Sequence, residues 1–192
     1  MPLLWLLADF FSGGLGPNPI QAIEQRSGLS AVSFLAASLA CTPLAWLFGW
    51  KTLMQRRKAL GNYGFLYAAL HLLTFFVLDY DLDFAAIWGD VGQKAYILIG
   101  AAAFLLLLPL AVTSFNYWMK RLGKNWKRLH RLVYLISPLV IIHFFMAKKG
   151  DFLRLSGDIS QPLAFAALIA ILLSLRLPPV KRVILRLKSK NT

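Results

Sequence analysis

The sequence lacks the features that mark disulfide-linked, nucleotide-binding or covalent heme proteins. Its single cysteine, Cys41, lies within an apolar run, so no internal disulfide can form. No Cys-x-x-Cys-His sequence occurs, which excludes the covalent attachment of c-type heme. Neither a Gly-x-Gly-x-x-Gly nor a Walker A sequence is present. The chain therefore has no recognisable site for a dinucleotide or for ATP.

Acidic residues are also scarce, with 8 Asp and Glu against 21 Lys and Arg and a formal net charge of +13. In a soluble protein this balance would suggest a nucleic-acid partner, but here the bases fall between or after long apolar runs. We therefore expect no nucleic-acid partner. With 58% hydrophobic residues and a mean hydropathy of +0.62, the chain is far more apolar than a soluble core requires. The expected surroundings are a lipid bilayer.

Five apolar runs approach the roughly 20 residues that a helix needs to cross a bilayer. They cover residues 31–50, 59–78, 95–112, 129–147 and 162–177. The opening run, residues 1–11, is too short to cross, and we expect a partial first helix there rather than a signal peptide. The connections leave no room for another domain. The predicted fold class is all-α, with residues 1–192 forming one polytopic transmembrane helical bundle of five full spans and a short first helix.

The basic residues predict the orientation of this bundle. Lys and Arg concentrate in residues 51–58, 120–131 and 176–190, whereas most acids lie in the alternate connections. By the positive-inside rule the basic segments face the cytoplasm. We therefore expect a multi-pass protein of the bacterial inner membrane with a cytoplasmic C-terminus. We expect the basic tail to be an unstructured anchor rather than a helix on the inner leaflet.

His71 and His143 lie among apolar neighbours, where an ionisable side chain is costly unless it meets a partner, a cavity or a metal. His71 follows Arg57 by 14 residues and His143 follows Arg128 by 15, so both lie about 20 Å from the basic rim. Two neutral imidazoles at one depth can bind a heme iron from opposite sides. The alternative is an interhelical hydrogen bond for each histidine. We favour ligation because the depths match.

His130 differs, because it lies at the basic edge, 13 residues before His143 on the same predicted helix. On a straight helix these two side chains would point about 140° apart. Pro138 lies between them and could bend the helix enough to correct part of that difference. The alternative is an interfacial histidine among solvated bases.

Three stretches become informative when they are taken together. They are residues 16–19 with Thr42-Pro43, residues 56–61 continuing to His71, and residues 122–143 with the run Leu-Gly-Lys-Asn-Trp-Lys-Arg-Leu-His-Arg. In these stretches the chain resembles the heme-binding membrane subunit of the bacterial periplasmic protein-methionine-sulfoxide reductase system, the MsrQ or YedZ type. That family belongs to the ferric-reductase-like transmembrane superfamily.

The resemblance implies a six-helix plan and a b-type heme between helices, one or two in number, with His71, His130 and His143 as ligands of heme iron. It also implies a flavin, FMN, and a molybdenum-dependent periplasmic partner that repairs oxidised methionine. The wider superfamily commonly places two histidines on each of two helices, but the position 14 residues before His71 is Arg57. A second heme at the basic rim would therefore lack an obvious histidine partner for His130.

On this resemblance the chain is an electron-transfer subunit of an oxidoreductase system rather than the subunit that converts the substrate. Its reductant must come from outside, from a cytosolic flavin reductase or a membrane quinol. One alternative is a self-standing cytochrome b, similar to the b561 class, that acts as a quinol or metal reductase. Another is a heme-free transporter or scaffold, which is disfavoured because no acid accompanies the histidines inside the membrane.

Four basic residues complete the predicted cofactor site, in which we expect no catalytic residue. Lys148 and Lys149 follow His143 by five and six residues and emerge about 8 Å above it, near the expected heme propionates. Ordinary snorkelling to the interface is the alternative for both lysines. Arg57 and Arg131 lie in the basic segments at the inner rim, and we include them among the cofactor-binding candidates.

Overall fold

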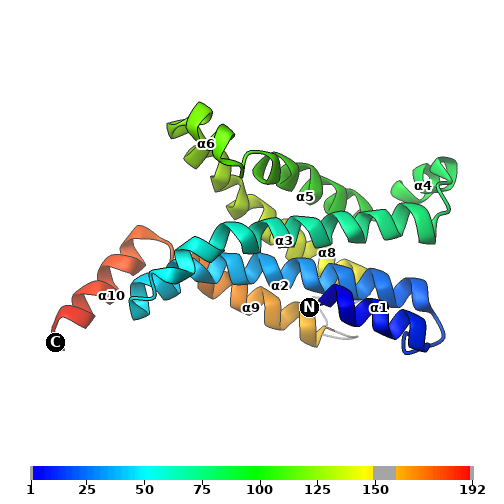
Figure 1. Cartoon of the computed structure of the whole chain (residues 1–192), viewed down its shortest axis with the longest axis horizontal. Helices are drawn as coiled ribbons and strands as arrows, with labels where there is room; N and C mark the ends of the chain where they lie inside the picture. The colour runs from blue at the N-terminus through cyan, green and yellow to red at the C-terminus, as the bar shows by residue number, and fades with distance from the viewer. Residues whose placement is uncertain (1, 149–158, 191–192) are drawn as a thin grey trace.

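The computed structural model describes residues 2–148 and 159–190, with side chains up to residue 186, and every regular element in them is a helix (Figure 1). The predicted all-α polytopic bundle is confirmed. In chain order the elements are α1 (Pro2–Ser12), α2 (Pro19–Phe48), α3 (Thr52–Thr74), the π-helix η1 (Phe75–Asp79), α4 (Phe84–Val91), α5 (Ala95–Val112), α6 (Asn116–Leu122), α7 (Lys124–Leu129), the 3₁₀-helix η2 (His130–Leu132), α8 (Val133–Ala147), α9 (Ser160–Ser174) and α10 (Pro178–Lys190).

Four helical runs in the described residues are long and apolar enough to cross a membrane, and α9 with α10 would make a fifth. The four are Pro19–Phe48, Thr52–Asp79, Ala95–Val112 and Lys124–Ala147. Figure 1 shows α6 and α10 at one end of the bundle and α4 at the other. The basic segments predicted from the sequence thus gather at one end, which we call the basic end. The acids of the connection between α3 and α5 lie at the opposite end.

Helix α2 begins at Pro19, well before the predicted start near residue 31. The Asn18 side chain accepts a hydrogen bond from the Gln21 backbone N–H at 3.2 Å, and Pro19 occupies the first helical turn. This is the usual cap of a helix start, and it outweighs the polar character of the first turns. Hydropathy alone placed the boundary too late, because residues 21–30 are mostly polar.

The core of the bundle lies between α2 and α9. Val32, Leu35 and Leu39 of α2 pack against Ile169 and Leu172 of α9. Many large apolar side chains point outward instead, among them Leu66, Leu105 and Ile171, each more than half exposed. Such an apolar exterior suits a bundle that is surrounded by lipid, where helix contacts rely on close packing rather than on expulsion of water.

Two expectations about the later helices need correction. The tail is not an unstructured anchor, because α10 is a helix that bends by 75° from α9. Pro178 and Pro179 suit a first helical turn, and the apolar residues that follow recur at helical spacing among the bases. Between His130 and His143 the structure adds a 3₁₀ segment, His130–Leu132, and Pro138 lies inside α8 as the sequence places it.

Candidate functional site

His71 of α3 and His143 of α8 meet inside the bundle. Their ring centroids are 6.0 Å apart and the ring planes are inclined by 78°. Two metal–nitrogen bonds of about 2 Å each, together with the ring radii, require a centroid separation of about 6 Å. The sequence predicts from depth alone that His71 and His143 lie together, and the structure places them side by side. Their spacing fits two ligands of one iron.

The same backbone contact holds each ring. Nδ1 of His71 lies 2.9 Å from the Glu24 carbonyl oxygen, and Nδ1 of His143 lies 2.9 Å from the Tyr96 carbonyl oxygen. A carbonyl oxygen only accepts hydrogen bonds, so Nδ1 carries the proton in both rings. The lone pair is then on Nε2, the nitrogen left to bind a metal. This hydrogen bond also fixes the orientation of each ring.

Gly28 and Gly100 make room for these two rings. A Cβ at Gly100 would lie 2.7 Å from Nδ1 of His143, and a Cβ at Gly28 would lie 3.3 Å from Nδ1 of His71. Gly28 follows Glu24 by four residues, and Gly100 follows Tyr96 by four. Each ring therefore rests on a helix backbone at a glycine, one turn after the carbonyl that accepts its hydrogen bond.

The two halves of the site are related by a constant offset in the sequence. In one half, Glu24 and Gly28 of α2 contact His71 of α3; in the other, Tyr96 and Gly100 of α5 contact His143 of α8. Each residue of the first half is followed by its counterpart 72 positions later, since 96 − 24, 100 − 28 and 143 − 71 all equal 72. Sequence reasoning missed both glycines. The equal spacing between glycine and histidine in the two halves was the signal that could have revealed them.

His130 does not join the pair. Its Nδ1 lies 3.1 Å from the carbonyl oxygen of Trp126, four residues earlier, and its ring stacks on the Trp126 ring at a centroid distance of 4.0 Å. Trp126 in turn donates from Nε1 to the Thr113 carbonyl at 2.9 Å, which ties this turn to the end of α5. In the part of the chain that the structure describes, His130 therefore contacts Trp126 rather than a second imidazole.

Arg131 and Lys148 are two further predicted site residues that the structure describes. Arg131 is exposed, and Lys148 is partly exposed at the end of α8. Lys149 lies outside the described residues. In the described part of the chain no three His, Cys, Asp or Glu side chains converge as a metal site.

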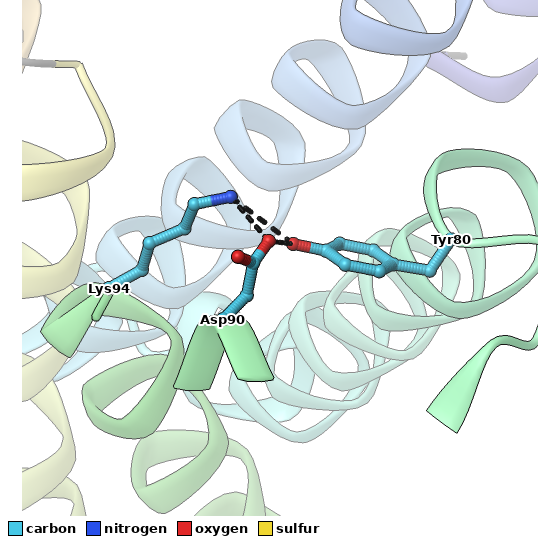
Figure 2. Close-up of polar contacts among 3 residues, drawn as sticks. All are labelled: Tyr80, Asp90 and Lys94. Atoms are coloured by element: carbon cyan, nitrogen blue, oxygen red, sulfur yellow. Dashed lines mark hydrogen bonds and ion pairs between the residues drawn. The ribbon is translucent and has the colours of Figure 1, made fainter. Parts of the chain in front are cut away.

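A polar cluster that the sequence did not predict joins Tyr80, Asp90 and Lys94 (Figure 2). Tyr80 donates its hydroxyl to Asp90, and Nζ of Lys94 lies 2.5 Å from Asp90 Oδ2 and 3.4 Å from the Tyr80 oxygen. The hydrogen bond from Lys94 holds the pKa of the Asp90 carboxyl below its usual range and raises the pKa of Lys94. The cluster links the segment after His71 to the start of α5, and so braces both halves of the histidine site.

Comparison with known proteins matches the same region. The family model described as the ferric reductase like transmembrane component matches residues 27–141. A Rhodospirillum rubrum protein is 44% identical over 95% of this chain and 85% of its own length. Relatives in Herminiimonas arsenicoxydans (42%, over 84% of this chain and 72% of the relative) and Xanthomonas oryzae pv. oryzae (40%, over 90% and 76%) are also similar. Each of the three is named protein-methionine-sulfoxide reductase heme-binding subunit MsrQ.

Proposed function

Because the chain belongs to the ferric reductase-like transmembrane component family, in its MsrQ branch, we propose that it binds a b-type heme between His71 and His143 and transfers electrons across the membrane. The observation that supports this proposal is the histidine pair, with ring centroids 6.0 Å apart and both Nδ1 atoms engaged by backbone carbonyls. The relatives contribute the heme and the methionine-sulfoxide reductase system by their names.

The chain supplies the ligands and their surroundings. A heme held here would provide reversible one-electron chemistry at its iron. His71 and His143 would hold the iron through Nε2, and the hydrogen bonds at Nδ1 would make the imidazoles more basic and favour the oxidised metal. The stacked Phe65 and Phe104 rings, 5.6 Å apart, join α3 to α5, the helices that carry His71 and Gly100.

The direction of electron transfer is part of the proposal. The basic end would face the cytoplasm, because loops rich in Lys and Arg are retained there. Electrons would enter from a cytosolic flavin reductase or a membrane quinol and leave toward a periplasmic, molybdenum-dependent protein-methionine-sulfoxide reductase. An FMN at the basic end belongs to the proposal through the family resemblance.

We propose one bis-histidine heme, because the position 14 residues before His71, where the wider superfamily commonly has a histidine, is Arg57. Any cofactor iron bound at His130 would have a single histidine ligand.

A visible spectrum of the purified full chain tests the central proposal. We expect a low-spin b-type spectrum, because paired imidazoles fill both axial positions. His71→Ala and His143→Ala should each abolish or severely weaken it, whereas His130→Ala should leave the bis-histidine heme bound. Absence of a Soret band after expression with ample heme would disprove heme binding. Loss of all heme in His130→Ala alone would disprove the assigned pair.

A further inference from the structure

Arg176, just after α9, reaches from the basic tail back to the backbone of α2. Its Nη2 donates to the Leu39 carbonyl at 2.6 Å and lies 3.3 Å from the Thr42 hydroxyl oxygen. The Leu39 carbonyl is available because Pro43, four residues later in α2, has no N–H to donate to it. One edge of the guanidinium therefore replaces the hydrogen bond that the proline removes from α2.

The remaining edge of Arg176 is not satisfied. Its Nε is buried and has no hydrogen-bond partner in the part of the chain that the structure describes. A buried polar group that is left unpaired costs free energy, and more so when it is charged. The Tyr134 hydroxyl lies beside the guanidinium, but it leaves this N–H without an acceptor. Arg176 therefore has one N–H donor that no described residue satisfies.

Arg57 lies against the same turns of α2. Its carbonyl accepts the Ser38 hydroxyl at 3.0 Å, one residue before the carbonyl that Arg176 contacts, and the two arginine charges act on each other. The Arg57 side chain makes no hydrogen bond or ion pair with any described residue. Both arginines therefore contact neighbouring turns of α2 near its basic end.

No described carboxylate compensates them. Glu24, the acid on α2, precedes Ser38 by 14 residues and therefore lies about 20 Å away along the helix. The other acids in the described residues are in α1 and between residues 79 and 90. The described residues therefore provide no carboxylate partner for these two arginines.

We propose that Arg57 and Arg176 bind the phosphate of a membrane phospholipid headgroup. Two guanidiniums match the charge and the several oxygens of a phosphate better than those of a single carboxylate. Arg176 stands at the 75° bend between α9 and the basic helix α10, where Lys181 and Arg182 follow it. An amphipathic basic helix of this kind lies at headgroup depth, so a lipid phosphate is the anion at hand.

This site is separate from the proposed heme site. Arg57 precedes His71 by 14 residues on one helix, which places the two about 20 Å apart. The failure of either proposal would leave the other intact, and the spectrum of the bis-histidine heme distinguishes them.

The test uses the full chain, purified in detergent and delipidated, with calorimetric titration of three probes. They are short-chain phosphatidylglycerol, the matching diacylglycerol without phosphate, and inorganic phosphate. Arg57→Gln removes a guanidinium that makes no hydrogen bond with described residues. Arg176→Lys keeps a charge that can reach the Leu39 carbonyl but loses the Nε donor. Arg56→Gln, at the exposed neighbouring position, is the matched control.

Phosphatidylglycerol should bind to the wild type and to Arg56→Gln with equal affinity, and about tenfold or more weakly to Arg57→Gln and Arg176→Lys. Diacylglycerol should not distinguish the variants. Equal phosphatidylglycerol affinity for Arg57→Gln and Arg56→Gln would overturn the proposal. So would an arginine-dependent response to inorganic phosphate alone, which would indicate a soluble ligand. Loss of heme from Arg57→Gln with unchanged lipid binding would assign the arginine to a heme carboxylate instead and would likewise refute the lipid site.

Discussion

Gly100→Ala is the smallest change that should disturb the histidine site. The added Cβ would lie 2.7 Å from Nδ1 and 2.8 Å from Cε1 of His143, whereas ordinary contacts begin near 3.4 Å. The ring must therefore move by about 0.7 Å, the difference between 3.4 and 2.7 Å. A shift of that size away from α5 would lengthen the Nδ1 contact with Tyr96 from 2.9 to about 3.6 Å, beyond the range of a hydrogen bond.

The loss of that hydrogen bond would leave the His143 ring less basic and less firmly oriented. The groups that accept hydrogen bonds from metal-binding histidines typically contribute about 10- to 100-fold in metal affinity. We therefore expect Gly100→Ala to weaken heme binding by about that factor and to raise the midpoint potential, because the ligand donates less charge to the oxidised iron. The electron paramagnetic resonance spectrum should also change, since it depends on the angle between the axial rings.

Two glycines provide the matched controls. At Gly28 the added Cβ would lie 3.3 Å from His71 Nδ1, so a shift of about 0.1 Å relieves the contact, and Gly28→Ala should remain close to wild type. At Gly89 a Cβ meets nothing within 4 Å, and Gly89→Ala should be silent. Heme titration by absorbance, a redox titration and the resonance spectrum measure the three effects. The reasoning is refuted if Gly100→Ala matches Gly89→Ala in all of them.

Three further predictions concern the rest of the chain. A reporter fused after Thr192 should be active only in the cytoplasm, and periplasmic activity would reverse the direction of electron transfer. Because the pKa of Asp90 is lowered in the folded protein, its stabilising effect is present above the ordinary carboxyl pKa and is lost as the pH falls through the lowered value. In the Asp90→Asn variant the thermal unfolding temperature should therefore fall less steeply as the pH is lowered into the acid range. The same pH dependence as in the wild type would contradict this. Lys148→Glu combined with Lys149→Glu should lower the heme midpoint potential or loosen the heme without preventing membrane insertion, and an unchanged redox titration at full occupancy would remove both lysines from the site.

The histidine pair could be predicted from the sequence because it depends on quantities that a helix keeps constant. A rise of 1.5 Å per residue converts the separation of Arg57 from His71 directly into depth, and the same holds for Arg128 and His143. The phase relation of His130 to His143 could not be predicted in this way. The 3₁₀ segment at His130–Leu132 changes the residues per turn just where the calculation assumed a regular helix.

The contacts between helices could not be predicted from the local sequence. Gly100 matters because the His143 ring reaches the backbone of another helix, and in the sequence only the equal glycine-to-histidine spacing of the two halves points to this contact. The role of Arg176 likewise depends on a carbonyl that Pro43 frees on α2, 137 positions away from the arginine. Local patterns identified the residue types that are costly inside a membrane, but only the packing of the helices shows what each of them contacts.

The offset of 72 positions between the two halves of the histidine site has a consequence for biosynthesis. Each pair of helices provides one imidazole, already oriented by its own glycine and carbonyl, and neither pair alone can hold an iron from both sides. At about 5–20 residues per second, the ribosome adds those 72 residues in roughly 4–14 s, so His71 enters the membrane several seconds before His143 exists. On the proposed ligation, capture of a heme by both histidines would therefore follow the insertion of α8, as a step that joins two halves prepared separately.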